Sequence, residues 1–327
     1  MRQVLILGAG KIGATVAAFL GSCGEYAVTV ADRDETSLAR VQGDIGVKTL
    51  RLDISDAPAL DAALAGKWAV LSALPFDLTP LIARAAARNQ VNYFDLTEDV
   101  ASTRIVKDLA KDAPVAFMPQ SGLAPGFVSI VAYDLARQFD SLHEVKMRVG
   151  ALAQYPSNAL KYNLTWSTEG IINEYCQPCE AIVDGEYREV PPLEEIETFS
   201  LDGITYEAFN TSGGLGTLCE TLKGKVDNLN YKSVRYPGHR DVMKMLIRDL
   251  RLGERQDLLK DIFEYALPTT MQDVVLVFVT VSGMKGGRLT QESFARKIYA
   301  RQLYGRPFSA IQITTAAGVC GVIDLMA

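Results

Sequence analysis

Short apolar runs alternate with amphipathic segments along the first 125 residues. Each run is apolar at consecutive positions, which is typical of a strand that is buried on both faces of a parallel sheet. The segments between the runs place apolar residues at helical spacing. This alternation predicts an α/β fold with a doubly wound parallel sheet. The expected strands are residues 3–9, 27–33, 47–55, 67–75, 91–97 and 113–122, and the clearest helices are 14–23, 56–66 and 78–90.

The pattern changes after about residue 126. A helix is expected over 127–139 and an amphipathic strand over 142–152, and the turn-separated segments between 184 and 211 suggest an antiparallel sheet. The segment 226–238 leads into a helix over 239–250, and the longest strand, 273–285, ends in a turn at Gly286–Gly287. The last segment, 309–327, predicts an apolar helix whose small residues suit close packing on the first sheet.

We therefore expect two domains. The first comprises residues 1–125 together with about 303–327, and the second is an α+β substrate domain over 126–302. A chain of 327 residues is also too long for one ordinary core.

A glycine-rich motif follows the first strand directly. Gly8, Gly10 and Gly13 form G-x-G-x-x-G, with Lys11 and Ile12 between the last two, and a helix follows. In this strand–turn–helix setting the first glycine permits the turn, the second admits a pyrophosphate, and the third allows close packing of the helix. The helix N-terminus offers free N–H groups to phosphates. The motif predicts a Rossmann domain that binds a dinucleotide.

The ends of the later strands extend this prediction. Asp32 ends the second strand, where a carboxylate accepts hydrogen bonds from the adenosine ribose, and this favours NAD. Arg33 beside it could pair with a 2′-phosphate, so NADP stays open. Asp32 could also simply cap the next turn. Ligands bind beyond the carboxyl ends of such strands, and the residues expected there are Asp53, Ile54, Ala73, Leu74, Pro75, Asp95, Ser121 and Gly122.

Composition narrows the class of protein. Apolar residues make up 48% and charged residues 22%, and the net charge of −6 is spread along the chain. The sequence contains no basic stripe that would indicate a nucleic-acid partner. It also contains no apolar run that is long enough for a membrane span. The sequence shows no signal-peptide layout at its start. We expect a cytoplasmic protein whose partner is a small molecule.

Five cysteines and two histidines make a disulfide scaffold or an imidazole metal site improbable. Cys176 and Cys179 form a CxxC, but no second pair accompanies them, so we expect no metal site. The glycines at 213–216 lack the preceding strand and the lysine of a phosphate loop, and we interpret them as a substrate-domain loop.

Several segments together resemble the saccharopine dehydrogenase-like family. They are GLAPGF (122–127), WSTEGIINEY (166–175), FNTSGGLGTLCETL (209–222) and YKSVRYPGHRDVMKML (231–246). Their order and spacing are most similar to the lysine 6-dehydrogenases of that family, over nearly the whole chain. The resemblance implies amine–imine chemistry with a nicotinamide cofactor. In the preferred form, NAD accepts a hydride from the ε-carbon of L-lysine, and the imine is hydrolysed to a semialdehyde that cyclises.

Such chemistry needs a cation for the α-carboxylate and a base for the ammonium proton. For the carboxylate we expect Arg235, with His239 four residues later across a Pro-Gly turn. For the base we expect Asp95, with Glu98 sharing the task and His239 as a further candidate. Each also has a structural alternative: an ion pair for Arg235, and helix capping for Asp95, Glu98 and His239. Glu174 and Tyr175 are expected to complete the pocket from the second domain.

Other functions remain open at this stage. Saccharopine dehydrogenase or reductase activity and carboxyspermidine-type dehydrogenase activity fit the same scaffold. A protein of another class, a dinucleotide sensor without catalysis, would keep the first domain but need not keep the polar residues of the second. A homodimer through the second-domain sheet is also expected, with the apolar strand 274–281 as its support.

Overall fold

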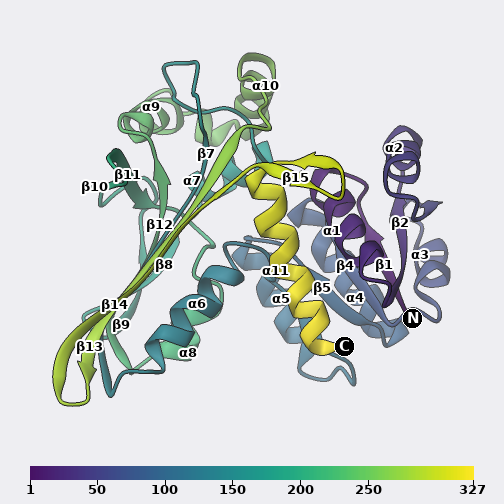
Figure 1. The fold of residues 1–327 in the computed structure, drawn as a ribbon, viewed down its shortest axis with the longest axis horizontal. Helices are drawn as coiled ribbons and strands as arrows, with labels where there is room; N and C mark the ends of the chain where they lie inside the picture. Colours follow the sequence, from purple (N-terminus) through teal and green to yellow (C-terminus); the bar gives the residue numbers. More distant parts are fainter. The chain divides into compact units, whose positions relative to one another are not determined.

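The computed structural model describes all residues, 1–327, and the chain divides into two compact units (Figure 1). Unit 1 comprises Met1–Gly126 and Gln312–Ala327, and unit 2 comprises Phe127–Ile311. The residues from 303 to 311, which the sequence places with the first domain, are therefore grouped with unit 2. They include the short hairpin of β15 (Arg301–Leu303) and β16 (Arg306–Phe308).

Unit 1 is built on a six-stranded parallel sheet of order β3-β2-β1-β4-β5-β6. This is the doubly wound order of dinucleotide-binding domains, in which the chain direction across the sheet reverses beside β1. Its strands are β1 (Arg2–Leu7), β2 (Tyr26–Asp32), β3 (Lys48–Arg51), β4 (Ala69–Ser72), β5 (Asn92–Asp95) and β6 (Phe117–Met118). The predicted fold class is confirmed.

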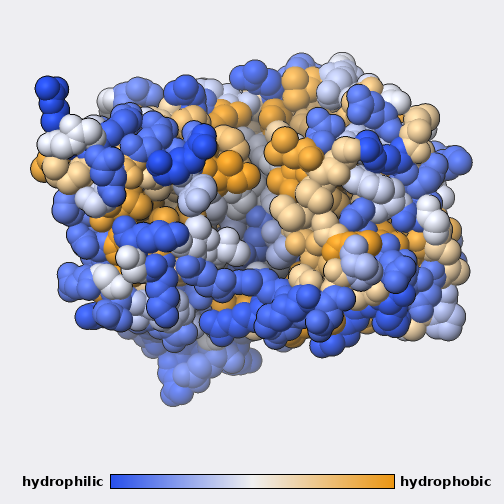
Figure 2. Space-filling model, turned by 90° about the horizontal axis from the view of Figure 1, so that it is seen from below, coloured by the Kyte–Doolittle hydropathy of each residue, from blue (hydrophilic) through white to orange (hydrophobic).

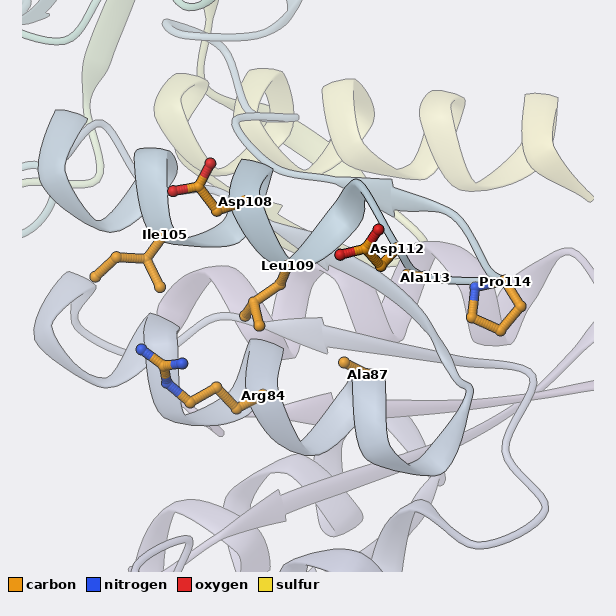
Figure 3. A pocket seen from close by; sticks show the side chains of 8 residues that line it. All are labelled: Arg84, Ala87, Ile105, Asp108, Leu109, Asp112, Ala113 and Pro114. Atoms are coloured by element: carbon orange, nitrogen blue, oxygen red, sulfur yellow. The ribbon is translucent and has the colours of Figure 1, made fainter.

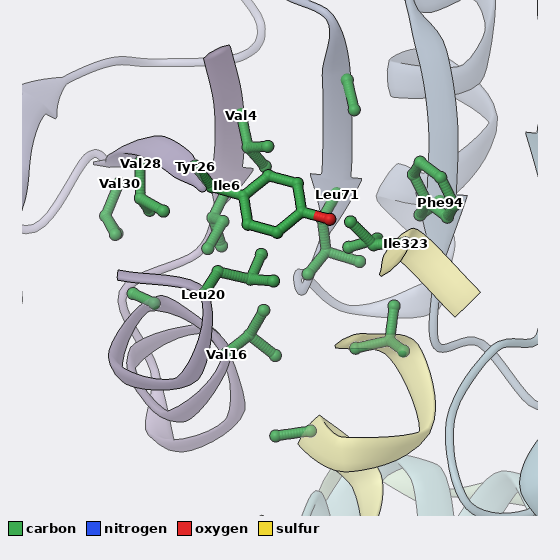
Figure 4. Close-up of a cluster of buried hydrophobic side chains, with 14 of the residues drawn as sticks. Val4, Ile6, Val16, Leu20, Tyr26, Val28, Val30, Leu71, Phe94 and Ile323 are labelled. Carbon is green, nitrogen blue, oxygen red and sulfur yellow. The ribbon is translucent and has the colours of Figure 1, made fainter. Parts of the chain in front are cut away.

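Helices cover both faces of this sheet. On one face, α1, α2 and the C-terminal helix α11 pack on β1, β2 and β4 around a cluster that includes Val16, Leu20 and Ile323 (Figure 4). On the other face, α3, α4 and α5 pack around Leu60, Ile82 and neighbouring side chains. The helices are α1 (Lys11–Ser22), α2 (Glu35–Ile45), α3 (Ala57–Leu64), α4 (Thr79–Asn89), α5 (Val100–Ala110) and α11 (Ala310–Met326), with a 3-10 turn η1 at Phe76–Leu78.

Unit 2 is an α+β unit around an eight-stranded sheet. Its main path runs β10-β11-β12-β7-β13-β14, and β8 joins β9 to β12. The strands are β7 (Ser141–Ala153), β8 (Cys179–Val183), β9 (Glu186–Val190), β10 (Glu197–Leu201), β11 (Ile204–Asn210), β12 (Val226–Arg235), β13 (Asp273–Lys285) and β14 (Arg288–Tyr299). The helices are α6 (Phe127–Ala136), α7 (Thr168–Cys176), α8 (Leu218–Leu222), α9 (His239–Lys244) and α10 (Gln256–Ala266), with η2 (Met245–Asp249) and η3 (Leu252–Glu254).

Two expectations need correction and one is extended. The segments between 184 and 211 form antiparallel pairs as expected, β9 with β8 and β10 with β11, but the unit 2 sheet as a whole is mixed, because β12 pairs with β7 in parallel. The predicted continuous helix over 239–250 is α9 followed by a π-helical turn at Met245–Asp249. The sixth strand of unit 1 is only two residues long, since prolines at 114 and 119 flank it and proline cannot donate to a ladder.

Large apolar side chains are exposed at several places on the surface. The face drawn in Figure 2 mixes hydrophilic and hydrophobic residues, and the most exposed large apolar side chains, such as Tyr265 and Leu325, lie on different elements. Scattered apolar residues of this kind are normal on a folded domain. None of the helices combines the length and the apolar character required to cross a bilayer.

A buried ionic cluster joins three strands of unit 2. Glu197 of β10 accepts from Arg148 Nε at 2.9 Å, from Arg148 Nη2 at 2.7 Å and from Lys232 Nζ at 2.8 Å. The two cations are buried, with side-chain exposures of 3% and 4%. Burial raises the pKa of Glu197, but the bonds and charges of Arg148 and Lys232 outweigh it and lower the pKa to about 2.

We expect Glu197→Gln to lower the free energy of unfolding by about 2–3 kcal/mol, since Arg148 and Lys232 would then lie buried against a neutral amide. We expect a smaller loss in the free energy of unfolding than for a fully buried ion pair, because the Glu197 side chain is 36% exposed. Because the folded-state pKa is depressed, this stabilisation is present above the unfolded pKa of about 4.5 and is lost as the pH falls towards 2.

Urea unfolding at neutral and acidic pH measures the effect. Glu144→Gln is the matched control, because Glu144 is also 36% exposed but its partner Lys146 is 37% exposed, and it should cost about 0–1 kcal/mol. Equal losses for the two variants would contradict the role given to the burial of the partners.

Candidate functional site

The glycine loop at the end of β1 leaves room for a ligand at one position. A Cβ on Gly13 would lie 2.0 Å from the Gly8 carbonyl oxygen, whereas a Cβ on Gly10 would have nothing within 4 Å. Gly8 has φ +111°, a conformation that favours glycine. Gly10 precedes α1 without a side-chain cap, so the first N–H groups of α1, at Lys11 and Ile12, are free for an anion. The loop therefore fits a pyrophosphate.

Asp32 lies against this loop. Its carboxylate accepts from the Ala9 N–H at 2.7 Å and from the Asp34 N–H at 2.9 Å. Each oxygen keeps further lone pairs for a ribose hydroxyl. The bond to Ala9 holds the Asp32 carboxylate beside the glycine loop, and the bond to Asp34 belongs to the turn after β2.

Asp53 follows β3 and is held by its own turn. Its carboxylate accepts from the Ser55 hydroxyl at 2.6 Å and from the Ser55 N–H at 3.0 Å. The Ser55 bonds, and then the charge of Arg33, lower the pKa of Asp53. The charge of Arg33 thus acts at Asp53, where the adenine is expected, and Arg33 is a cation that a 2′-phosphate could meet. Ile54, next to Asp53, packs against the core on the α3–α5 side.

The carboxyl end of β4 approaches the glycine loop from the other side. A Cβ on Gly8 would lie 2.7 Å from the Ala73 carbonyl and 3.3 Å from the Leu74 side chain. The Ala73 N–H donates to the Leu7 carbonyl at 2.8 Å, and Pro75 leads into the turn η1. The structure therefore brings Ala73 and Leu74 beside Gly8, as expected for residues along a bound dinucleotide.

Asp95 occupies the end of β5, and its carboxylate is engaged within the chain. It accepts from Tyr93 Oη at 2.8 Å, from the Gln120 N–H at 2.8 Å and from the Thr97 N–H at 3.1 Å, and the residue is 1% exposed. Burial raises the pKa of Asp95 to about 6, and these hydrogen bonds limit the rise. This geometry ties the end of β5 to the segment after β6.

Glu98 lies beside this carboxylate and is half-buried. Burial, and then the charges of Asp99 and Asp95, raise the pKa of Glu98 to about 7. The cap of α5 is Asp99, which accepts from the Ser102 N–H at 2.6 Å, so neither Asp95 nor Glu98 caps that helix. A carboxyl group with a pKa near neutrality can accept a proton under physiological conditions.

Two polar atoms flank Asp95 without a partner. Ser72 lies opposite Asp95 in the β4–β5 register, and its Oγ is buried and makes no hydrogen bond. Gln120 Oε1 is likewise buried and makes no hydrogen bond. Gln120 also has φ +58°, which is uncommon for a residue other than glycine. The sequence analysis missed both residues, because a serine at the end of a short apolar strand, or a glutamine just after one, carries no motif.

The segment after β6 is packed tightly under α11. The Ser121 N–H donates to the Asp95 carbonyl at 2.9 Å, and the Ser121 hydroxyl donates to the Met118 carbonyl at 3.0 Å. A Cβ on Gly318 of α11 would lie 2.4 Å from the Gly122 carbonyl oxygen. The small residues of α11 therefore serve this contact, and Gly122 is fixed by packing within unit 1.

Unit 2 gathers most of its predicted site residues into one buried cluster. Arg235 Nε donates to Tyr175 Oη at 2.9 Å, and Tyr175 Oη lies 3.1 Å from His239 Nε2. The Arg235 guanidinium carbon lies 5.5 Å from the centre of the Tyr162 ring, a residue that the sequence analysis did not select. Glu174, at 6% exposure, adds a negative charge that raises the pKa values of Tyr175 and Arg235.

The electrostatics of the cluster oppose a second positive charge. Burial alone would lower the pKa of Arg235, but Tyr175, Tyr162 and Glu174 raise it overall, so the guanidinium stays charged. Burial, and then the charge of Arg235, lower the pKa of His239 to about 3. His239 is therefore a neutral ring at neutral pH.

The turn before α9 is fixed by Glu207. Its carboxylate accepts from the Gly238 N–H at 2.8 Å and from the Arg240 N–H at 2.7 Å. Glu207, and not His239, thus caps the helix that begins at His239. The His239 ring itself is held by its contacts with Tyr175 Oη and the Leu160 carbonyl.

The other motifs hold packing positions. Cys176 and Cys179 are free thiols, and burial raises the pKa of Cys176 to about 11. A Cβ on Gly214 would lie 2.3 Å from the Tyr231 ring, so the 213–216 segment is a packed loop. Gly286 and Gly287 form the turn between β13 and β14. No group of three or more His, Cys, Asp or Glu side chains is placed to hold a metal ion.

A cavity of about 470 Å³ lies away from these residues, between α4 and α5 (Figure 3). Arg84 and Ala87 line it from α4, and Ile105, Asp108 and Leu109 line it from α5. It contains none of the predicted site residues. The cavity is therefore not the predicted dinucleotide site.

Comparison with known proteins assigns both units to one family. Residues 4–118 match the saccharopine dehydrogenase NADP binding domain, and residues 122–307 match the saccharopine dehydrogenase C-terminal domain. Two curated relatives are saccharopine dehydrogenases [NADP(+), L-glutamate-forming]. The protein from Saccharomyces cerevisiae is 25% identical over 52% of this chain, and the one from Pyricularia oryzae is 23% identical over 75%. The matches span 40% and 57% of those relatives.

A solved structure shows the same fold over the whole chain. The apo saccharopine dehydrogenase (L-Glu forming) from Saccharomyces cerevisiae aligns with a TM-score of 0.82 at 17% identity, and covers 100% of this chain and 91% of that one. The homospermidine synthase from Legionella pneumophila, solved in complex with NAD, aligns with a TM-score of 0.62 at 12% identity, over 99% of this chain and 84% of that one. At these identities the likeness establishes the fold alone.

Proposed function

We propose that this chain, which belongs to the saccharopine dehydrogenase family and is an NAD(P)-dependent oxidoreductase, catalyses the NAD-dependent oxidative deamination of the ε-amino group of L-lysine. In this reaction the ε-CH₂–NH₃⁺ group loses a hydride and a proton to give an iminium, CH=NH₂⁺. Water then releases ammonium and leaves the semialdehyde, which cyclises. The bound dinucleotide supplies the hydride acceptor.

The observation that carries the choice of substrate is the set of buried cations in unit 2. Arg148 pairs with Glu197, and Lys232 pairs with Glu197 and Glu195. Arg235 donates to the Tyr175 phenol and to the Val234 carbonyl, and with the negative charge of Glu174 nearby it stays charged. A single such guanidinium suits a substrate with one carboxylate, such as lysine, better than saccharopine with three.

We assign the remaining roles as follows. The N–H groups at the start of α1, together with Gly10, hold the pyrophosphate, and Asp32 accepts from the adenosine ribose. Asp32 beside the loop favours NAD over NADP, because a 2′-phosphate would meet a carboxylate. Glu98 takes up the ammonium proton, and Asp95 fixes the end of β5 by its three hydrogen bonds.

We expect Glu98→Gln to reduce kcat by about 100-fold or more, since proton transfer by a positioned side chain contributes that much or more. A base must be deprotonated to act, and burial raises the pKa of Glu98 to about 7. The wild-type kcat/KM should therefore rise with pH through about 7, and this rise should be absent in the variant. A pH–rate profile of both proteins measures it.

Asp95→Asn is the comparison for that profile. This substitution should lower the thermal stability, because an amide cannot accept hydrogen bonds from all three groups that donate to Asp95. The rise of kcat/KM near neutral pH should persist. A rise lost in Asp95→Asn but kept in Glu98→Gln would contradict the assignment of the base.

A second candidate is the oxidation of saccharopine, which is favoured by the similarity to saccharopine dehydrogenases [NADP(+), L-glutamate-forming]. Incubating the protein with NAD or NADP and with L-lysine, saccharopine or a control amino acid, while following the absorbance of the reduced cofactor, separates the two. Turnover of L-lysine with NAD supports the proposal. Turnover of saccharopine alone would replace the proposal with saccharopine oxidation. NAD binding without turnover of any substrate would favour a dinucleotide sensor without catalysis. The homodimer and the cytoplasmic location stay predictions.

A further inference from the structure

The protons around His239 follow from the partners of its ring. The ring is 0% exposed, Nδ1 lies 2.9 Å from the Leu160 carbonyl oxygen, and Nε2 lies 3.1 Å from Tyr175 Oη. A carbonyl oxygen can only accept a hydrogen bond, so Nδ1 carries a hydrogen. In the neutral ring Nε2 is then the acceptor.

Arg235 fixes the other end of this row of hydrogen bonds. Its Nε lies 2.9 Å from Tyr175 Oη and can only donate. The tyrosine oxygen therefore accepts from Arg235 and uses its own hydrogen for His239 Nε2. The row runs in one direction, from Arg235 through Tyr175 and His239 to the Leu160 carbonyl.

The row holds the guanidinium from one side. Nη1 also donates to the Val234 carbonyl at 2.9 Å, and the rings of Tyr162 and Tyr175 lie 5.5 Å and 5.9 Å from the guanidinium carbon. The two hydrogen bonds use Nε and Nη1, and neither of them involves Nη2. Arg235 is thus oriented before any ligand binds, which lowers the entropy cost of binding a carboxylate.

We propose that His239 is a positioning residue: as a neutral ring protonated at Nδ1, it accepts from Tyr175 and thereby holds Arg235 in the orientation that binds the substrate carboxylate. The last clause rests on the proposed function, whereas the protonation state does not. This role replaces the proton-transfer role that the sequence suggested for His239, because both ring nitrogens are already engaged.

The charged and titratable groups that face the ring agree with this state. Arg235 of β12 is a fixed positive charge, and Tyr175 of α7 and Tyr162, before α7, are phenols whose pKa values are raised by burial. Phe209 of β11 stacks on the ring with centres 6.3 Å apart. The buried carboxylate of Glu174 acts on Tyr162, Tyr175 and Arg235, and burial together with the charge of Arg235 still lowers the pKa of His239.

The protonation state is tested by NMR of protein labelled with ¹⁵N-histidine. The chain has two histidines, and exposed His143, 3.0 Å from Asp227, provides the solvent-accessible reference. His143→Gln assigns the signals. We expect His239 to show a neutral ring with the hydrogen on Nδ1 throughout about pH 5–8. A hydrogen on Nε2, or a ring that becomes charged in this range, would overturn the proposal whether or not the protein oxidises lysine.

The link to Arg235 is tested by two amide variants. The oxygen of Gln in His239→Gln can take the place of Nε2 and accept from Tyr175, whereas Asn in His239→Asn can replace Nδ1 but cannot reach Tyr175. We expect His239→Asn and Tyr175→Phe to raise the KM for the amino-acid substrate about tenfold or more, since each removes a hydrogen bond in a row that ends on a charge.

In both of these variants the KM for the dinucleotide should stay unchanged, and His239→Gln should recover most of the substrate affinity. Equal KM increases in His239→Gln and His239→Asn would overturn the positioning role, as would increases shared by both substrates. If the wild-type protein turns over saccharopine but not lysine, the same KM comparison applies to saccharopine, and only the proposed function fails.

Discussion

Arg235→Met is expected to lower kcat/KM for L-lysine by about 100- to 1,000-fold, mostly through KM. Truncating one partner of a buried, charge-assisted pair costs about 2–5 kcal/mol, and each 1.4 kcal/mol corresponds to a factor of ten. Arg235 is 3% exposed, so solvent screens its charge little. Methionine keeps much of the apolar stem and removes the charge.

Steady-state kinetics with both substrates varied measures this change. Arg248→Met is the matched control, because Arg248 lies in the same unit but pairs with Glu194 at the surface. It should leave KM for lysine unchanged. Thermal unfolding shows whether Arg235→Met is folded, and a folded variant with a KM within about threefold of wild type would contradict the assignment of Arg235.

The second large effect is expected in the glycine loop, where two alanine substitutions should act differently. In Gly13→Ala the new Cβ would lie 2.0 Å from the Gly8 carbonyl oxygen, so the backbone of β1 or α1 must move. Overpacking of this kind costs about 1–3 kcal/mol, and more against rigid backbone. In Gly10→Ala the Cβ meets nothing within 4 Å, and Gly10 has φ −70°, which any residue adopts.

We therefore expect Gly13→Ala to lower both the free energy of unfolding and the affinity for the dinucleotide. Gly10→Ala should keep the wild-type stability and weaken dinucleotide binding at least tenfold, because its methyl group occupies the approach of the pyrophosphate. Urea unfolding and a fluorescence titration with NADH measure the two quantities. Wild-type NADH affinity in Gly10→Ala would show that the pyrophosphate does not lie on this loop.

The sequence predicted unit 1 well because its signals are local. A buried parallel strand is apolar throughout, and a phosphate loop needs glycines at fixed spacing, so β1, α1 and Asp32 could be found without any tertiary information. The strand β14 could not. It lies at the edge of the unit 2 sheet, and its residues Arg288–Tyr299 are mostly polar and partly exposed, so they show no buried pattern.

The candidate site was predictable only in part for a similar reason. The resemblance pointed to Tyr175, Arg235 and His239, and the structure joins these three residues by hydrogen bonds. Their roles depend on partners that are remote in sequence. Leu160 fixes the proton on His239, and Gln120 engages Asp95 from 25 residues away. No spacing rule relates such residues, because only the folded chain brings them together.

The transfer of hydrogen from the ε-carbon tests the central claim most directly. L-lysine carrying two deuterium atoms on that carbon would be incubated with the protein and NAD, and the reduced cofactor and the cyclised product analysed by mass spectrometry. Our account predicts one deuterium on the reduced cofactor, one retained in the product, and release of ammonium. Reduced cofactor without deuterium, or reduction only when saccharopine replaces lysine, would contradict it.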